Sequence, residues 1–204
     1  MKVLFCLPGG GFSSTWIQAW TWTLTTLHQE GIEYSLSNTT GSEIAALRNK
    51  VAGGATALGE FQRPFPDHDH DVTFWIDSDM VWTPDDVLRL LGHDMPIVSG
   101  LYANGRGEPN AFTDRSTRVE PGDGLEQVYA TGFGFIKVDR DVYEHIPYPW
   151  FRLMPSETGG TDSEDVSFCR LARAAGFEVW LDKGVHVGHE KPCIVKVGGV
   201  VSVY

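Results

Sequence analysis

The sequence has 204 residues, which suits a single folded domain with its own hydrophobic core. Its formal net charge of −11 argues against a broad surface for nucleic acid or anionic lipid, because both require exposed Lys and Arg. The three Cys are widely spaced and form no CxxC pair, which argues against a disulfide framework or a zinc site. No segment is apolar over the length of a membrane span, so we expect a soluble, cytoplasmic protein without a membrane partner.

The first half of the chain alternates between short apolar runs and helical patterns. The runs predict strands and the patterns predict helices: strands at 3–7, 33–37, 72–76 and 97–102, and helices at 13–29, 42–51 and 83–92. Ser42 is expected to cap the second helix. Thr83, Pro84 and Asp86 have the spacing of a capping box for the third.

The second half is more irregular. Its expected elements are a polar loop at 104–123, strand pieces within 127–138 hinged at Thr131-Gly132-Phe133-Gly134, a short helix at 141–145, a loop at 148–160, a helix at 163–175, a strand at 177–181 and a final piece at 186–189. The order of elements predicts one α/β domain over 1–204, with a Rossmann-like, mostly parallel central sheet flanked by helices.

The triplet Asp77-Ser78-Asp79 follows the buried strand at 72–76 directly. Two carboxylates so close at the end of an apolar strand repel each other and resist desolvation. A hard divalent cation would neutralise them, with a diphosphate supplying further oxygen ligands. The alternative is structural, with Asp77 ending the strand and Asp79 capping a turn.

A second acidic motif, Thr161-Asp162-Ser163-Glu164-Asp165, opens the last predicted helix. Acids at this position complement the helix dipole, but three of them exceed what a cap requires. A general base for an acceptor hydroxyl must be a carboxylate or His within hydrogen-bond reach. Asp162, Glu164 and Asp165 are therefore the candidate catalytic residues.

His186 and His189 follow the last predicted strand. An imidazole nitrogen is a good ligand for Mn²⁺ or Zn²⁺ and a poorer one for Mg²⁺. His68 and His70 form a rival cluster with the neighbouring aspartates. Because this cluster lies in a polar loop that no strand precedes, we expect it to be solvated.

The order of the motifs resembles that of GT-A glycosyltransferases, over residues 2–190. The motifs are Arg48-Asn49, residues 74–76 leading into Asp77-Ser78-Asp79-Met80, Thr131-Gly132-Phe133-Gly134, Glu164-Asp165-Val166-Ser167-Phe168 and Val187-Gly188-His189. The sequence looks most similar to small family 2-like and phage-type members. Near its C-terminus it also resembles the catalytic domain of polypeptide N-acetylgalactosaminyltransferases.

The resemblance implies a metal-dependent glycosyltransferase of the GT-A fold that uses Mn²⁺ or Mg²⁺ and a nucleotide sugar, a UDP- or GDP-sugar. Asp79 would bind the cation directly, and Asp77 would contact the cation or the ribose. His189 would be the protein ligand from the other side.

The resemblance also implies roles for the remaining residues. Pro8, Arg48 and Gly132 would border the nucleotide together with Asp77. If the enzyme inverts configuration, Asp165, or Glu164 beside it, would activate the acceptor hydroxyl.

The acceptor is a hydroxyl compound that the sequence does not identify. The chain lacks the longer acceptor region that is usual in the family, so the acceptor pocket must come from 104–123, 148–160 and the tail. A nucleic-acid acceptor would need a basic patch, for which Arg106, Arg115 and Arg118 are the local candidates.

Two other functions stay open. One is a nucleotidyltransferase acting on a sugar phosphate, although the glycines at 9–11 are followed by Phe12-Ser13-Ser14-Thr15 without the basic residue that class normally has. The other is a non-catalytic module that binds a nucleotide sugar, against which the intact Asp77-Ser78-Asp79 and His189 argue.

Overall fold

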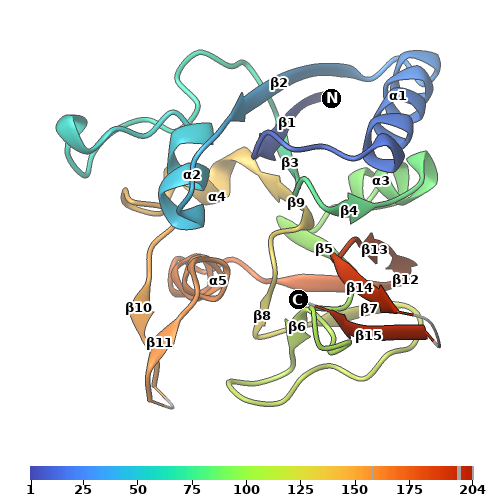
Figure 1. Ribbon diagram of the computed structural model, residues 1–204. Helices are drawn as coiled ribbons and strands as arrows, with labels where there is room; N and C mark the ends of the chain where they lie inside the picture. The colour runs from blue at the N-terminus through green and yellow to red at the C-terminus, as the bar shows by residue number, and fades with distance from the viewer. Residues whose placement is uncertain (158, 197–198, 204) are drawn as a thin grey trace.

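The computed structural model describes residues 1–157, 159–196 and 199–203, and within them seven strands form the central sheet (Figure 1). In spatial order the strands are β2 (Glu33–Thr39), β1 (Lys2–Pro8), β3 (Val72–Ile76), β9 (Phe135–Asp139), β5 (Ile97–Leu101), β12 (Trp180–His186) and β7 (Leu125–Gln127). Strands β9 and β7 are antiparallel to their neighbours, and the other five share one direction. The predicted mostly parallel α/β sheet is therefore confirmed.

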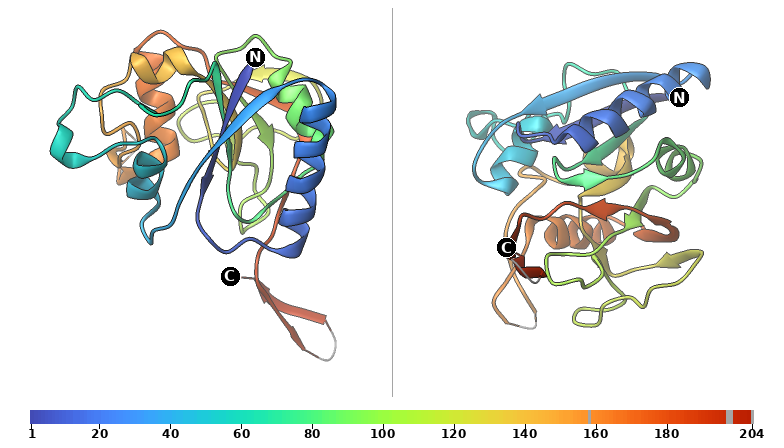
Figure 2. Two further views of the ribbon diagram at one scale, coloured as in Figure 1. Left: turned by 90° about the horizontal axis from the view of Figure 1, so that it is seen from above. Right: turned by 45° about the vertical axis from the view of Figure 1, so that its right-hand side comes forward.

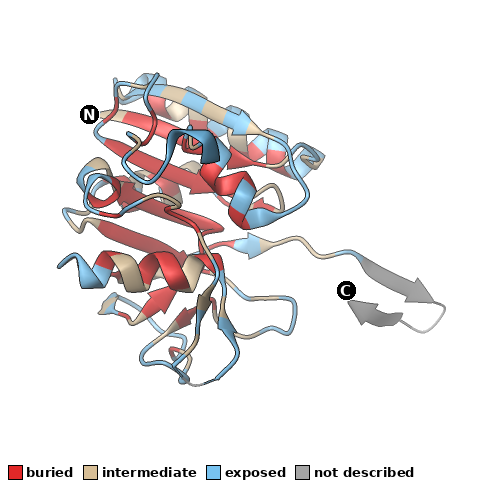
Figure 3. Cartoon of the chain, turned by 90° about the vertical axis from the view of Figure 1, so that its left-hand side faces the viewer, coloured by how far each residue is buried: buried red, intermediate tan, exposed pale blue. Residues whose placement is uncertain are grey.

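Helices cover both faces of the sheet (Figure 2). One face carries α1 (Ser14–Gln29) and α3 (Pro84–Leu91), and the other carries α2 (Ile44–Val51), α4 (Arg140–Glu144) and α5 (Glu164–Ala174). Successive side chains of a strand point to opposite faces. In β1, Val3 and Phe5 accordingly pack with the first layer, and Leu4 and Cys6 pack with the second. The central strands are buried on both sides, as Figure 3 shows, which explains their unbroken apolar runs.

Smaller pieces surround the sheet. They are a 3-10 turn, η1 (Thr56–Leu58), and the strand pairs β4 (Met80–Val81) with β13 (Gly188–His189), β6 (Ala111–Phe112) with β8 (Ala130–Thr131), β10 (Met154–Pro155) with β11 (Thr161–Asp162), and β14 (Cys193–Lys196) with β15 (Gly199–Val203). The pair β4–β13 matters most, because it joins the end of β3 to the C-terminal segment. Within the described ranges, no helix combines the length and apolarity needed to cross a bilayer.

One of the two predicted helix caps is confirmed and the other is wrong. At α3, the Thr83 N–H donates to Asp86 Oδ2 at 2.8 Å, as in a capping box. At α2, Glu43 caps the helix in place of Ser42. Its carboxylate accepts from the N–H groups of Ala45 at 3.1 Å and Ala46 at 2.6 Å, because the helix begins only at Ile44.

The expectation that the whole rival histidine cluster is solvated is also wrong. His70 is only 2% exposed, and its ring meets the edge of Phe65 at a centroid distance of 5.2 Å. This burial lowers the pKa of His70. The adjacent carboxylates of Asp69 and Asp71 remain exposed and bond to Lys2. His70 thus packs as a core histidine at the base of a polar loop.

Candidate functional site

The triplet Asp77-Ser78-Asp79 lies at the carboxyl end of β3, next to the turn that follows β1. A Cβ built on Gly9 would stand 3.2 Å from the Ser78 Oγ, so the two strand ends are in close contact. The Asp77 N–H donates to the carbonyl oxygen of Gly134 at 2.9 Å, and Trp16 Nε1 donates to the Asp77 carbonyl oxygen at 3.0 Å. Pro8 ends β1 at this edge, where open α/β sheets bind their ligands.

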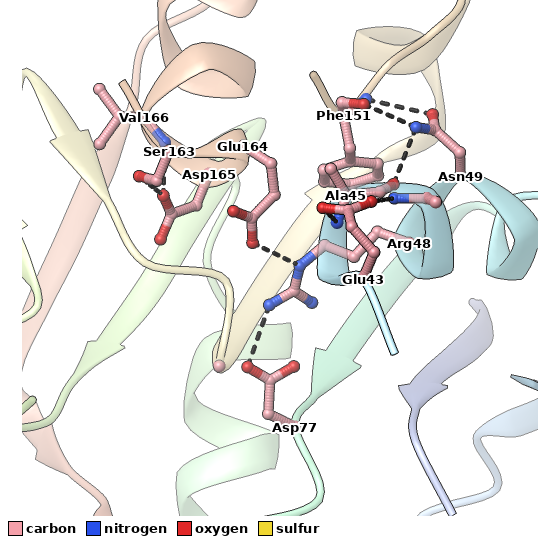
Figure 4. Close-up of polar contacts among 12 residues, drawn as sticks. Glu43, Ala45, Arg48, Asn49, Asp77, Phe151, Ser163, Glu164, Asp165 and Val166 are labelled. Carbon is pink, nitrogen blue, oxygen red and sulfur yellow. Dashed lines mark hydrogen bonds and ion pairs between the residues drawn. The ribbon is translucent and has the colours of Figure 1, made fainter. Parts of the chain in front are cut away.

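Arg48 of α2 connects the triplet to the acidic helix α5 (Figure 4). Its side chain is 3% exposed, and Nη2 donates to Asp77 Oδ2 at 3.0 Å while Nε donates to Glu164 Oε1 at 3.3 Å. The guanidinium carbon lies 5.6 Å from the ring centroids of both Trp75 and Phe133. Residues far apart in the sequence therefore form one buried charge cluster.

This cluster leaves hydrogen-bonding capacity unused. Arg48 Nη1 and Asp77 Oδ1 are both buried without a partner among the described residues. Burial raises the pKa of Asp77 and the pKa of Glu164, and the neighbouring Arg48 offsets this only in part. Burial alone would lower the pKa of Arg48, but the charge of Asp77 raises it above its usual value. A donor and an acceptor are thus ready for a polar ligand at this point.

Asn49, the next residue of α2, clamps the neighbouring loop. Its amide nitrogen donates to the carbonyl oxygen of Phe151 at 2.6 Å, and the Phe151 N–H donates back to Asn49 Oδ1 at 3.2 Å (Figure 4). The two residues of the predicted Arg48-Asn49 motif therefore have different contacts. Arg48 bonds to the acidic residues Asp77 and Glu164, and Asn49 holds the loop at 148–153.

Asp79 has a different environment from Asp77. The pairing of β4 with β13 sets His189 opposite Met80, and the Glu190 N–H donates to the Asp79 carbonyl oxygen at 2.7 Å. Asp79 Oδ2 then accepts from His189 Nε2 at 3.0 Å and from Lys191 Nζ at 2.7 Å. Although burial favours the protonated acid, these two bonds hold the pKa of Asp79 at about 2.

The imidazole of His189 is oriented from both sides. Nδ1 lies 2.8 Å from the carbonyl oxygen of Ala103, which fixes Nδ1 as the donor and directs Nε2 at Asp79. Although burial alone would lower it, the pKa of His189 is raised by the hydrogen bond to Asp79. With Nδ1 bonded to a backbone carbonyl, Nε2 could ligate a metal once it has lost the proton that it donates to Asp79.

Tyr102, at the end of β5, fills the space between these groups, and sequence reasoning missed it. Its hydroxyl accepts from the Gly134 N–H at 2.9 Å, and its ring meets His189 edge-on at 5.5 Å. A Cβ on Gly132 would lie 2.3 Å from this hydroxyl and 3.5 Å from Asp165 Oδ2. Gly132 therefore leaves the room that Tyr102 needs. A polar aromatic residue directly after a buried strand was the only available signal.

The three acids of the second motif have separate partners. Glu164 bonds to Arg48, and Asp165 bonds to the hydroxyl of Ser163 and at 2.8 Å to the Val166 N–H. Asp162, the last residue of β11, is paired with Arg170 of α5. The structure thus brings Glu164 and Asp165 to the side of Arg48 and Tyr102, and it engages Asp162 elsewhere.

The residues present fit a divalent cation that shares its coordination with a ligand. Within the residues described, no three His, Cys, Asp or Glu side chains converge to hold a metal ion by themselves. Asp79 and His189 form a pair of one carboxylate and one imidazole, a donor set suited to Mn²⁺. Asp77 Oδ1, which lacks a partner in the described chain, is a further oxygen donor at the same strand end. The remaining positions would be filled by oxygens of a bound diphosphate and by water.

Two cavities are lined by segments that neighbour the candidate residues. The larger of the two, about 620 Å³, is lined by Asn49, Lys50, Tyr148 and Phe151 among others. The smaller, about 290 Å³, is lined by Tyr102, Ala103, Pro109 and His186 at the carboxyl ends of β5 and β12. The loops predicted to form an acceptor pocket thus contribute to a cavity each.

Neither a family model nor a curated protein matches the sequence. Solved structures do match the fold. A197 from STIV aligns with a TM-score of 0.59 at 17% identity, covering 94% of this chain and 86% of that one. The catalytic domain of Drosophila beta1,4-galactosyltransferase 7, complexed with xylobiose, aligns with a TM-score of 0.52 at 14% identity over 90% of this chain and 66% of its own.

GalNAc-T7, solved with UDP, GalNAc and Mn²⁺, aligns with a TM-score of 0.56 at 11% identity. The alignment covers 92% of this chain but only 43% of GalNAc-T7. At these identities the likeness concerns the fold alone. The chain has a GT-A-like fold, the fold of its glycosyltransferase neighbours.

Proposed function

We propose that this protein is a metal-dependent glycosyltransferase that moves a sugar from a nucleotide-sugar donor to a hydroxyl acceptor. One domain over residues 1–204 would carry the whole site. The finer resemblance to family 2-like and phage-type enzymes, with a UDP- or GDP-sugar as donor, belongs to the same proposal. Three neighbouring solved structures, which contain xylobiose, Mn²⁺ with UDP-Gal and xylobiose, or Mn²⁺ with UDP and GalNAc, agree with this class of ligands.

The observation that carries the proposal is the pair Asp79 and His189. Strand β13 returns from the far end of the chain to set His189 Nε2 3.0 Å from Asp79 Oδ2. A purely structural Asp79 would need only a cap or a turn contact. The oriented imidazole, and the unpartnered Asp77 Oδ1 nearby, instead support a site for Mn²⁺ or Mg²⁺ and a diphosphate.

The donor would lie across the carboxyl ends of β1 and β3. Asp79 and His189 would hold the cation, which when bound offsets the charge that develops on the departing diphosphate. Asp77 would contact the cation or the ribose. Pro8 and Gly132 would border the nucleotide, and Arg48 would offer its unpartnered Nη1 to it.

The base would come from α5. Glu164 is buried and bonded to Arg48, so its carboxylate already has a partner, and Asp162 is paired with Arg170. Asp165 lies beside Gly132, and its hydrogen bonds within the described residues come from Ser163 and Val166 at the start of its own helix. In an inverting reaction Asp165 would take the acceptor hydroxyl proton as that oxygen bonds to the anomeric carbon and the nucleoside diphosphate leaves.

The experiment is a set of calorimetric titrations with UDP, GDP, CDP and TDP, each with Mn²⁺ and with EDTA. We expect one diphosphate to bind only with the metal, and Asp79→Ala to weaken that binding by at least about 100-fold, which corresponds to about 2.7 kcal/mol. The physical reason is the loss of the carboxylate that joins the cation to the protein.

The matched control is Asp67→Ala, which removes an exposed aspartate from the rival histidine cluster and should leave binding unchanged. Failure of every diphosphate to bind, with or without metal, would contradict the proposal. Release of pyrophosphate from a nucleoside triphosphate would point to nucleotidyl transfer instead. Binding without hydrolysis or transfer to any acceptor would leave a non-catalytic module.

A further inference from the structure

Lys191 forms an ion pair with the Asp79 carboxylate, the group that the proposed divalent cation would need as a ligand. Its Nζ lies 2.7 Å from Asp79 Oδ2, the same oxygen that receives His189 Nε2 at 3.0 Å. The backbone bond from the Glu190 N–H to the Asp79 carbonyl oxygen, at 2.7 Å, holds this segment in place. The backbone next to Lys191 is thus fixed to Asp79, which keeps the ammonium group close to the carboxylate.

The charges around Asp79 explain why the ammonium group of Lys191 lies against it. Asp77 and Glu164 share the single guanidinium of Arg48, so Asp79 has no arginine of its own in the described part of the chain. Lys191 and His189 are its two ion-pair partners among the described residues. A lone carboxylate at the end of a buried strand would resist desolvation, and Lys191 removes this penalty in the absence of metal.

We propose that the Lys191 ammonium is the resident counter-ion of Asp79 and competes directly with the divalent cation for Asp79 Oδ2. This inference rests on the proposed function and concerns the regulation of the same site. The cation would bind weakly alone, because it must displace an ammonium that then loses its anion. Together with a diphosphate it would bind tightly, because the displaced ammonium gains a new anionic partner.

The reach of the lysine makes the exchange possible. Metal–oxygen bonds of about 2.0–2.6 Å on each side of a cation place diphosphate oxygens within about 4–5 Å of the Asp79 carboxylate. Lys191 has a flexible four-carbon stem and is one-quarter exposed, so its ammonium can move over that distance. Linkage then requires that the metal and the diphosphate raise each other's affinity by the same factor.

The test measures Mn²⁺ binding by counting free Mn²⁺ with electron paramagnetic resonance, first without nucleotide. We expect Lys191→Met to bind Mn²⁺ alone about 10-fold more tightly than the wild type, because the competitor is gone. In the presence of the diphosphate selected by the calorimetric titrations, the variant should gain less affinity than the wild type does. The two effects have opposite signs, which loss of folding would not produce.

Two variants serve as controls. Lys183→Met removes a lysine that pairs with Glu126 at 2.8 Å and is similarly part-buried, and it should behave as the wild type in both arms. Lys191→Arg keeps a cation at the site and should keep weak binding of Mn²⁺ alone.

The outcomes separate the inference from the proposed function. If Asp79→Ala abolishes Mn²⁺ binding but Lys191→Met matches the wild type, Lys191 does not compete with the metal, and the proposed metal site itself is retained. If Lys191→Met weakens binding of Mn²⁺ alone, Lys191 supports the metal and the inference is overturned. Absence of Mn²⁺ binding in all variants, with and without diphosphate, would overturn both.

Discussion

Two clusters of arginine and carboxylate differ in how completely their hydrogen-bonding groups are satisfied. Asp182 is fully buried, and its two oxygens accept from Arg89 Nε at 2.6 Å, Arg89 Nη2 at 2.8 Å, His93 Nε2 at 2.8 Å and the Gly184 N–H at 2.9 Å. The Arg48 cluster, by contrast, leaves Arg48 Nη1 and Asp77 Oδ1 without partners among the residues described. Both clusters use the same chemistry, and only one is complete.

This difference in hydrogen bonding distinguishes a cluster with a structural role from one with a candidate functional role. Burial alone would raise the pKa of Asp182, but the bonds from Arg89 and His93 lower it below its ordinary value of 3.8. Burial raises the pKa of Asp77, and its single bond to Arg48 does not reverse this. A saturated cluster stabilises the fold, whereas an unsaturated one at a strand end keeps capacity for a ligand.

The largest effect on stability is expected from Arg48→Met. It leaves the buried Glu164 and the one-quarter-exposed Asp77 without their cation, so the free energy of unfolding at pH 7 should fall by about 3–5 kcal/mol. Arg89→Met is the matched control, and its loss should be smaller, at most about 2–3 kcal/mol, because Arg89 is half exposed and Asp182 keeps His93 and Gly184. Urea denaturation measures both. Equal losses of unfolding free energy in the two variants would show that the two clusters contribute alike to stability.

A somewhat smaller effect, with a distinct pH dependence, is expected from Asp182→Asn. The variant should lose about 2–3 kcal/mol of unfolding free energy at pH 7. Because the folded pKa of Asp182 lies below 3.8, its stabilisation is full above that pH and is lost as the pH falls through the folded pKa. Denaturation curves of wild type and variant should therefore converge in acid. A difference independent of pH would contradict the assignment.

The smallest effect on stability is expected from Asp77→Asn. Since the folded pKa of Asp77 is raised, its ionisation opposes folding at neutral pH, and a neutral amide should change the unfolding free energy by less than about 1 kcal/mol. Metal-dependent binding of the diphosphate should nevertheless weaken about 10-fold or more. A variant that unfolds readily but binds the diphosphate normally would show that Asp77 has a structural role and not a binding role.

Much of the fold could be predicted because local signals agreed with the tertiary structure. The apolar run at 72–76 became β3, buried on both faces, and the Thr83 and Asp86 spacing formed the expected cap of α3. The position of the triplet at the end of β3 followed from the same pattern. These features depend on residues that are close together in the sequence, so they could be predicted from the sequence of this chain.

The unpredicted features depend on contacts across the fold. The pairing of Arg48 with Glu164 joins residues 116 positions apart, and that of Lys191 with Asp79 joins residues 112 apart. No periodicity encodes such pairs. The burial of His70 likewise follows from Phe65 packing on its ring, although the flanking residues are polar. The separation of Asp162 from Glu164 and Asp165 depends on Arg170, one turn beyond the predicted motif.

A crystal structure grown with Mn²⁺ and the diphosphate that binds most tightly would locate the cation itself. We expect an anomalous peak bonded to the Asp79 carboxylate and His189 Nε2, diphosphate oxygens completing its coordination, and Lys191 moved off Asp79 Oδ2. Mn²⁺ bound elsewhere, or a diphosphate that leaves the Asp79–His189 pair intact, would contradict this expectation.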